Sequence, residues 1–391
     1  MITFNEFRAS SQIIFGIIAI VTNIYLLLLI HFRSPKQLGL YKYMMLCIAY
    51  FEIVYSVVDL IAEPFIHSYK STFAVLITTK HSYFGDAGNI ALLIAYCALY
   101  GFSMAIFAVH FTFRYFATQS STKKKYCQGS FAIVWFALPV IYSLVWAADC
   151  ALFLKREDMS NFIRQMIASP SSESASHIFR QTILDTYDLM IDDVIYMGPY
   201  YYPIDANGTQ YISYKSFVGM GELLVQIMIS IFCVFYFGIR CYFKISNEMS
   251  DIAEMSKKTR KLQKQLFNSL VLQALIPVVL MYIPVSAVLT FPALNLNFSL
   301  GVQSCAITIA VYPAIDPLPT IFIVDAYRRA TFELVMELPS EMLSENISKE
   351  TAKIVVLSKK MSKLQKKLFY ALVVQETPDE SFWDSAIGNP P

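Results

Sequence analysis

The chain has 391 residues, of which 56% are hydrophobic and only 15% are charged, and its mean hydropathy is +0.50. Soluble domains carry about 25% charged residues, so these values exclude an ordinary soluble protein and indicate a chain that lies largely in lipid. The net charge of +2 gives no basis for binding nucleic acid, and the seven cysteines show neither CxxC pairs nor metal-ligand spacing, so we expect no metal site and no cofactor.

Seven apolar runs of about 20 residues are each long enough to cross a bilayer as an α-helix. Lipid offers no hydrogen-bond partners to the backbone, and the runs are too long and too continuously apolar for barrel strands. Arg33 and Lys36, rather than a cleavage site, follow the first run, so we interpret it as a retained helix. The sequence therefore predicts an all-α, integral membrane bundle within residues 1–338, with helices over 12–32, 43–65, 89–113, 131–152, 218–240, 266–290 and 301–325.

Lysine and arginine are distributed unevenly between the two sides of this bundle. With the N-terminus outside, the short inner loops and Arg240 hold 14 of them, whereas the outer segments hold eight, five of which lie in the long loop 153–217. Because positively charged short loops stay in the cytoplasm, we expect the N-terminus outside and the C-terminus in the cytoplasm. The long loop is then external, and its sequon at Asn207 is a candidate glycosylation site.

The second and last predicted helices carry acidic residues inside the membrane, where ionisable groups are expensive and usually functional. Glu52, Asp59 and Glu63 are seven and four residues apart, so they share one helical face, and Asp316 lies at the same depth as Glu52 in the last helix. We expect an intramembrane polar network in which Glu52 and Asp316 could share a proton. The alternative is that nearby hydroxyl groups satisfy each carboxyl separately.

Prolines interrupt the last two predicted helices. A proline removes a backbone donor and clashes with the preceding turn, so kinks are expected, although prolines are also common in membrane helices generally. The expected kinks lie at Pro277, Pro284, Pro313, Pro317 and Pro319. Residues 301–325 contain no lysine that could hold retinal, and no HExxH, GxSxG or Walker motif is present, so we predict that the chain is not an enzyme.

Two motifs and one loop segment resemble a known receptor family. They are Pro313-Ala-Ile-Asp-Pro-Leu-Pro-Thr-Ile-Phe-Ile-Val-Asp-Ala-Tyr-Arg-Arg, Val109-His110-Phe-Thr-Phe-Arg-Tyr-Phe-Ala117, and SKKTRKLQKQLFNSLVLQALIP at 256–277. Over residues 10–338 the chain resembles the nematode serpentine chemoreceptors of the Str class. The resemblance implies an olfactory-type receptor in the plasma membrane, in the sensory cilium of a chemosensory neuron, which binds a small-molecule chemical and activates a heterotrimeric G protein.

The resemblance also implies roles for residues at the cytoplasmic ends of the helices. Arg114 and Tyr115 resemble the acid-Arg-Tyr motif of rhodopsin-like receptors without its acid, although Arg114 could instead be a positive-inside anchor. Asp316-Pro317 and Tyr327 resemble the NPxxY region with the tyrosine displaced. The disulfide that orders the second outer loop of those receptors has no match. The other expected G-protein-side residues are Lys257, Lys258, Arg260, Lys261 and Arg328.

A small organic ligand would need a mostly apolar pocket with a few placed polar groups. The outer halves of the predicted helices supply seven candidates, of which we expect about a third to line the cavity and the rest to pack between helices. These candidates are Asn89, Tyr96, Glu222, Gln226, Tyr282, Gln303 and Ser304.

Residues 358–375 repeat residues 256–273 at 12 of 18 positions, but no apolar run follows the second copy. One interpretation is a basic amphipathic helix on the inner leaflet. The other, which we favour, is a stray copied exon or a joined fragment of a neighbouring gene, which would leave 339–391 as a disordered cytoplasmic tail.

Two other functions stay open at this point. A seven-helix transporter usually shows inverted repeats, and no such symmetry is visible in this chain. A ligand-gated channel of the insect odorant receptor type would have its N-terminus inside.

Overall fold

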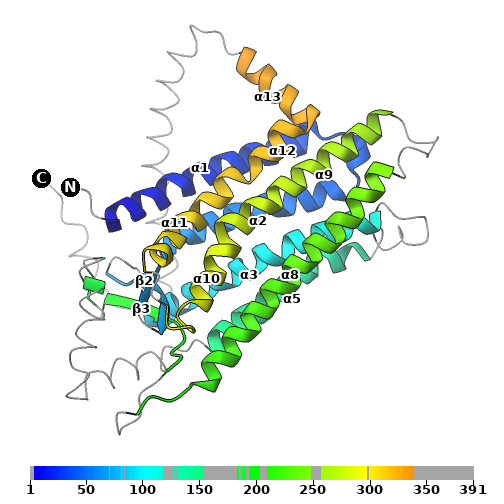
Figure 1. The fold of residues 1–391 in the computed structure, drawn as a ribbon. Coiled ribbons are helices and arrows are strands. Elements are labelled where there is room, and N and C mark those ends of the chain that lie inside the picture. The colour runs from blue at the N-terminus through cyan, green and yellow to red at the C-terminus, as the bar shows by residue number, and fades with distance from the viewer. Residues whose placement is uncertain are drawn as a thin grey trace, which may run out of the picture. The chain divides into compact units, whose positions relative to one another are not determined.

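The computed structural model describes residues 4–69, 71–80, 82, 84–117, 127, 131–153, 183–184, 187, 189–190, 193–202, 209–247, 257–296 and 299–337. This part of the chain is mostly helical (Figure 1). Seven of its helices are long and apolar enough to cross a membrane, which confirms the expected number of spans. They cover Phe4–Arg33, Tyr41–Ala62, Asp86–Ala117, Ala132–Phe153, Tyr214–Ile245, Lys258–Thr290 and Ser304–Ile323.

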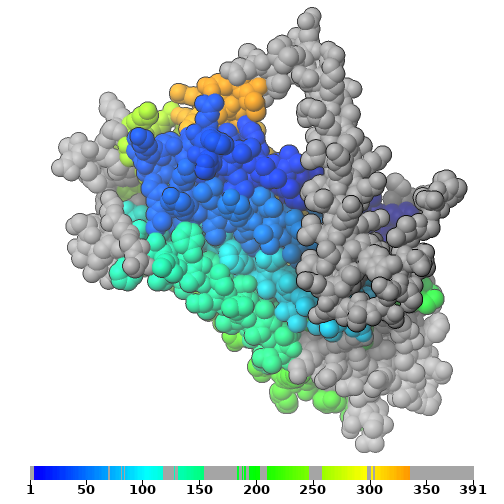
Figure 2. All heavy atoms as spheres, turned by 180° about the vertical axis from the view of Figure 1, so that it is seen from behind, coloured from blue at the N-terminus to red at the C-terminus, as the bar shows by residue number. Residues whose placement is uncertain are grey.

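The first five spans are single helices that pack around one central member. α3 (Asp86–Ala117) contacts α2 (Tyr41–Ala62), α5 (Ala132–Phe153) and α8 (Tyr214–Asn247), while α1 (Phe4–Arg33) packs on α2. Figure 2 shows the face along which α1, α2, α3 and α5 follow one another. The burial of α3 agrees with this central position. Of its most apolar stretch 56% is buried inside the protein, against 22% for α5 and 28% for α8.

Large apolar side chains point outward from the peripheral helices. Val21, Ile133 and Phe232 are each more than 60% exposed within the protein. In water such a surface would drive aggregation, but in a bilayer lipid chains cover it without penalty. The chain is therefore a multi-pass membrane protein.

The sixth and seventh spans are broken helices. The sixth consists of α9 (Lys257–Pro277), a π-helical turn η6 (Val278–Tyr282) and α10 (Ile283–Thr290). The seventh consists of α11 (Ser299–Ile315) and α12 (Pro317–Ile323), with Asp316 between them. A further helix, α13 (Asp325–Glu337), follows.

The prolines account for these breaks. Pro277 and Pro284 flank the π-helical turn, Pro313 lies inside α11, and Pro317 and Pro319 lie in the first turn of α12. Since Pro317 has no N–H, the carbonyl of Pro313 loses its helical donor. The Nδ2 of Asn23, on α1, donates to that carbonyl at 3.0 Å and replaces the missing bond.

The expectation of an all-α fold is wrong in one respect, because a three-stranded antiparallel sheet caps one end of the bundle. Its strands are β1 (Phe65–Tyr69), β2 (Thr72–Thr78) and β3 (Val194–Met197), in the order β1-β2-β3. The helix expected over 43–65 ends at Ala62, and Glu63 adopts the left-handed conformation with φ 42°. Pro64 explains this early end, since a proline disfavours helical backbone at the residue before it.

We call the end of the bundle that carries this sheet the sheet end, and the end that carries Arg114, at the close of α3, the opposite end (Figure 1). β3 comes from the long 153–217 loop and pairs with the hairpin between α2 and α3. None of the seven cysteines, each of which lies in a described position, forms a disulfide. Hydrogen bonds from Tyr201 to the Leu289 carbonyl at 2.8 Å and from Tyr202 to the Ala293 carbonyl at 2.7 Å tie this loop to the end of the sixth span instead.

The tail at 339–391, with the repeated segment 358–375, lies outside the described residues, as does Asn207. The domain boundary after residue 338 and the two interpretations of the repeat therefore stay predictions.

We expect Gly198→Ala to destabilise the sheet. A Cβ at Gly198 would lie 1.9 Å from the carbonyl oxygen of Phe73 on β2, so the strands would have to separate. Steric overpacking of this kind costs about 1–3 kcal/mol, which a lower melting temperature of the detergent-solubilised protein would report. Gly221→Ala is the control, because a Cβ there meets nothing within 4 Å. Equal melting temperatures for the two variants would contradict the tight β2–β3 approach.

Candidate functional site

Glu52 on α2 and Asp316 at the break in the seventh span lie in contact and are fully buried. The break explains the position of Asp316, since the backbone turns there between α11 and α12. Tyr312 donates a hydrogen bond to Glu52 Oε1 at 3.3 Å. One oxygen of each carboxyl, Glu52 Oε2 and Asp316 Oδ1, has no partner among the described residues. Two buried carboxyls in contact repel each other when both are charged, so the geometry favours one proton between them.

α9 joins this pair through an amide side chain. Gln273 Nε2 donates to Asp316 Oδ2 at 2.8 Å, and the hydroxyl of Thr320 donates to Gln273 Oε1 at 2.9 Å. Glu52, Gln273, Tyr312, Asp316 and Thr320, which we call the carboxyl network, thus connect the second, sixth and seventh spans. The sequence interpretation named only the two acids, because an uncharged Gln or Thr inside an apolar run has no distinctive pattern.

Asp59 and Glu63 do not belong to the carboxyl network. Asp59 is 2% exposed and lies near Tyr55 and Tyr96, towards the sheet end. Glu63 caps α2 and is only partly buried. The four acids therefore divide into two sites, Glu52 with Asp316 and Asp59 with Glu63.

Arg8 is a buried cation at the sheet end that the sequence interpretation missed. Its guanidinium donates to Gln12 Oε1 at 2.6 Å and Asn5 Oδ1 at 2.8 Å, and it lies 5.1 Å from the centre of the Phe65 ring. The first predicted helix begins at residue 12, so Arg8 falls in the predicted outer segment. The spacing of Arg8 and Gln12, one helical turn, was the available signal.

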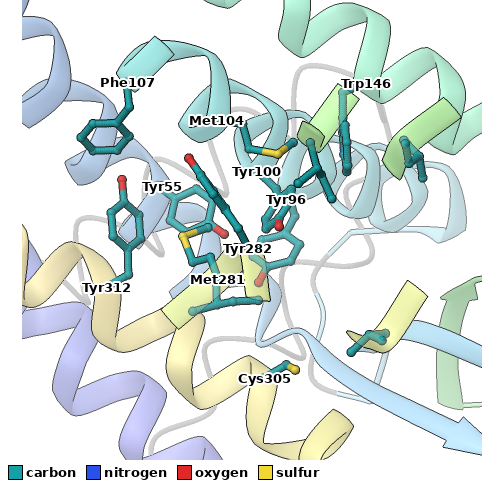
Figure 3. Close-up of a cluster of buried hydrophobic side chains, with 14 of the residues drawn as sticks. Tyr55, Tyr96, Tyr100, Met104, Phe107, Trp146, Met281, Tyr282, Cys305 and Tyr312 are labelled. Atoms are coloured by element: carbon teal, nitrogen blue, oxygen red, sulfur yellow. The ribbon is translucent and has the colours of Figure 1, made fainter. Parts of the chain in front are cut away.

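Four tyrosines, which we call the tyrosine cluster, converge in the bundle towards the sheet end. They are Tyr55, Tyr96, Tyr100 and Tyr282 (Figure 3). Tyr55 and Tyr96 stack with ring centres 5.8 Å apart, and Tyr100 meets Tyr282 edge to face at 6.4 Å. Tyr282 donates to the carbonyl of Ser103 at 3.0 Å, whereas the hydroxyls of Tyr55 and Tyr100 have no hydrogen-bond partner among the described residues.

Only two of the seven proposed ligand residues, Tyr96 and Tyr282, belong to this cluster. Asn89 instead holds the start of α3, since its side chain bonds Ser82 Oγ and the Phe84 carbonyl. Gln226 is buried and donates to Asp149 on α5. The remaining three are Glu222 and Ser304, which are exposed, and Gln303, whose side chain lies outside the described residues.

Arg114 is buried at the opposite end and bridges two helices. It donates to the carbonyl of Gln263 at 2.9 Å and to Gln263 Oε1 at 3.2 Å, and it lies 4.7 Å from the centre of the Tyr41 ring. A lipid-facing anchor would be exposed, so this geometry argues against the positive-inside interpretation of Arg114. The residue instead connects the end of α3 to the first turns of α9.

A second link at this end joins α9 to α13. Lys261 pairs with Asp325 at 2.7 Å, and Arg328 pairs with the same carboxylate at 2.6 Å. The hydrogen bond from Lys261 lowers the pKa of Asp325, so its carboxylate stays charged near neutral pH. Beside the pair lies a cavity of about 710 Å³ between the short segment around Pro35, α9 and α13.

The other residues expected on the G-protein side surround this cavity or lie near it. Tyr327 is buried, and its hydroxyl lies 2.8 Å from Ser34 Oγ; burial raises its pKa to about 12. Tyr115 is partly buried against Phe237. Lys258 and Arg260 are exposed, and the side chain of Lys257 lies outside the described residues.

We expect the substitutions Glu52→Gln and Asp316→Asn to be coupled, because each carboxyl is the other's neighbour. The effect of the double variant on the free energy of unfolding should differ from the sum of the single effects by about 0.5–3 kcal/mol. Glu52→Gln combined with Asp149→Asn is the control, since these two side chains share no partner, and it should be additive within about 0.5 kcal/mol. Additive effects of Glu52→Gln and Asp316→Asn on the free energy of unfolding would contradict the carboxyl network.

Comparison with known proteins identifies the family of this chain. The family model described as serpentine type 7TM GPCR chemoreceptor Str matches residues 8–332. The chain is 36% identical to the G-protein coupled receptor str-217 of Caenorhabditis elegans, over 81% of this chain and 87% of that protein. It is 30% identical to serpentine receptor class r-10 of the same species, over 80% and 86%, and 29% identical to its Caenorhabditis briggsae namesake, over 80% and 85%. The chain belongs to the Str family of serpentine seven-transmembrane chemoreceptors.

Proposed function

We propose that this chemosensory receptor binds a small external chemical within the helix bundle at the sheet end and activates a heterotrimeric G protein at the opposite end. The sheet end then faces the outside, with the N-terminus, and the C-terminus lies in the cytoplasm. This orientation follows the concentration of Lys and Arg in the short loops of the opposite end. The receptor would lie in the plasma membrane of a sensory cilium, with Asn207 available for glycosylation.

The carboxyl network is the observation that carries the proposal. It lies between the tyrosine cluster and Arg114 and is built from the second, sixth and seventh spans, of which the last two are broken. Tyr312 packs edge to face against Tyr55 of the tyrosine cluster, and Gln273 lies on α9, the helix that Arg114 contacts at Gln263. A ligand that moves these tyrosines therefore has a contiguous path to the residues expected to meet the G protein.

The opposite end supports the second half of the proposal. The cavity beside Lys261 and Asp325 is open and lined by Lys258, Lys261 and Arg329 as well as by polar groups. If the bonds of Arg114 and Lys261 to their partners break, α9 is released from α3 and α13, and the cavity widens. Broken helices adjacent to such contacts are suited to this type of movement.

Expression in cells that carry a promiscuous G protein tests this function. We expect a set of small volatile and water-soluble chemicals to contain at least one that evokes G-protein activation only in cells with the receptor. Surface staining of an N-terminal tag should show that the receptor reaches the surface of the responding cells. Uptake of the chemical without G-protein activation would favour a transporter and contradict the proposal.

We expect Arg114→Met to raise signalling without ligand. Methionine keeps the apolar stem but removes the hydrogen bonds to Gln263 that hold α9 against α3. Hydrogen bonds from a charged group contribute about 1.5–3 kcal/mol, so basal activity should rise about tenfold, measured as ligand-free G-protein activation. Lys264→Met, which removes an exposed charge from the same helix, is the control and should leave the basal level unchanged. A basal level equal in both variants would show that Arg114 does not restrain the resting state.

A further inference from the structure

Asp59 is a buried carboxyl without a partner. It is 2% exposed, and neither of its two side-chain oxygens accepts a hydrogen bond from any described residue. A buried carboxylate that no donor satisfies is expensive, so such a group in a folded protein is either protonated or bound by a partner outside the described residues. Glu52 and Asp316, by contrast, each have at least one bonded oxygen.

The surroundings of Asp59 offer further free acceptors. Tyr55 lies one helical turn before Asp59 on the same face of α2, and Asp59 is an electrostatic neighbour of both Tyr55 and Tyr96. The hydroxyl oxygen of Tyr100 accepts no hydrogen bond from a described residue, and that of Tyr55 has only the hydroxyl of Tyr96 beside it. Tyr55 and Tyr96 also present a stacked pair of rings. Carboxylate oxygens beside aromatic faces form an environment that attracts a cation.

The charged side chains that interact with Asp59 in the described part of the chain do not balance. They are Glu63 and Arg8, so two carboxyls face one guanidinium. Arg8 is occupied elsewhere, since it donates to Gln12, Asn5 and the carbonyls of Glu63 and Pro64, and it forms no hydrogen bond or ion pair with Asp59. One positive charge is therefore missing from this group of described residues.

We propose that Asp59 and the tyrosine cluster bind the ammonium group of a small primary amine, so that the external chemical this receptor detects belongs to the aliphatic or aromatic amines. This inference rests on the proposed receptor function and names the chemical class of its ligand. A primary ammonium has three N–H donors, which match the two oxygens of Asp59 and the hydroxyl of Tyr55. Its carbon chain would lie against the apolar side chains that surround the tyrosine cluster, among them Met104 and Met281 (Figure 3).

The same geometry disfavours other ligand classes at this position. An anion would be repelled by Asp59 and Glu63, and a neutral alcohol or ketone would leave the carboxylate uncompensated. A quaternary ammonium carries the charge but has no N–H, so it cannot satisfy the unpartnered oxygens.

The test is a thermal shift assay on the purified, detergent-solubilised full chain, which needs no G protein. The probes are n-butylammonium chloride, n-butanol and n-butyltrimethylammonium chloride. We expect n-butylammonium to raise the melting temperature of the wild type in a concentration-dependent manner, and the other two to have a smaller effect or none. Asp59→Asn should weaken the apparent affinity for n-butylammonium at least about tenfold.

Two further variants keep the result interpretable. Asp86→Asn removes an exposed carboxylate from the start of α3 and should bind n-butylammonium as the wild type does. Tyr55→Phe removes only a hydroxyl and should weaken binding even if Asp59→Asn does not fold. The inference is overturned if the wild type gains no stability from n-butylammonium, if n-butanol stabilises it equally, or if Asp59→Asn and Tyr55→Phe bind the amine as the wild type does. Failure of every chemical to activate a G protein would instead contradict the proposed function, because amine binding does not depend on signalling.

Discussion

The constraint on which the rest of this structure depends is that lipid cannot hydrogen-bond to the backbone. Every apolar stretch that crosses the bilayer must therefore satisfy its own N–H and C=O groups, and the α-helix is the form in which a single stretch can do so. Wherever the helical bonds are interrupted, another part of the protein must supply the missing partner. The breaks in the sixth and seventh spans are thus the positions at which polar side chains have to gather.

The seventh span shows this directly. Pro317 leaves the carbonyl of Pro313 without its helical donor, and Asn23 from α1 provides one. At the same break, Asp316 points into the interior, where it meets Glu52 and Gln273. The residues that repair the backbone and the residues that form the carboxyl network are therefore neighbours. A rearrangement of the broken helix would change both together, which suits a receptor whose two ends must communicate.

Much of the fold follows from simple patterns, because each span needs about 20 apolar residues and the sequence contains seven such runs. The features of the fold that the sequence patterns do not predict are local ones. β1 begins directly after Pro64, so only its first residue, Phe65, lies within the helix predicted over 43–65, and the rest of the strand lies where only a loop was predicted. β3 is four residues long inside a 65-residue loop, and its pairing with β2 depends on contacts that no local pattern encodes.

The candidate site was predicted less well than the fold, for a geometrical reason. Whether a polar residue faces the bundle or the lipid depends on the rotation of its helix, which a uniformly apolar run does not reveal. Depth along the helix matters as well, since Gln226 and Glu222 lie one turn apart on the same face of α8, yet one is buried and the other exposed. The acids Glu52 and Asp316 could be placed because charge inside a membrane is itself a signal, whereas Gln273 and Tyr55 carry none.

The most direct test of this account concerns which end of the bundle faces the outside. Intact cells that express the receptor with a tag at its N-terminus would be stained with an antibody and, separately, treated with protease before their fragments are mapped. The account predicts that the tag is stained and that cleavage falls in the sheet-end loop 153–217, while the segment 257–264 is spared until the membrane is permeabilised. Cleavage at 257–264 in intact cells, with the sheet-end loop protected, would contradict it.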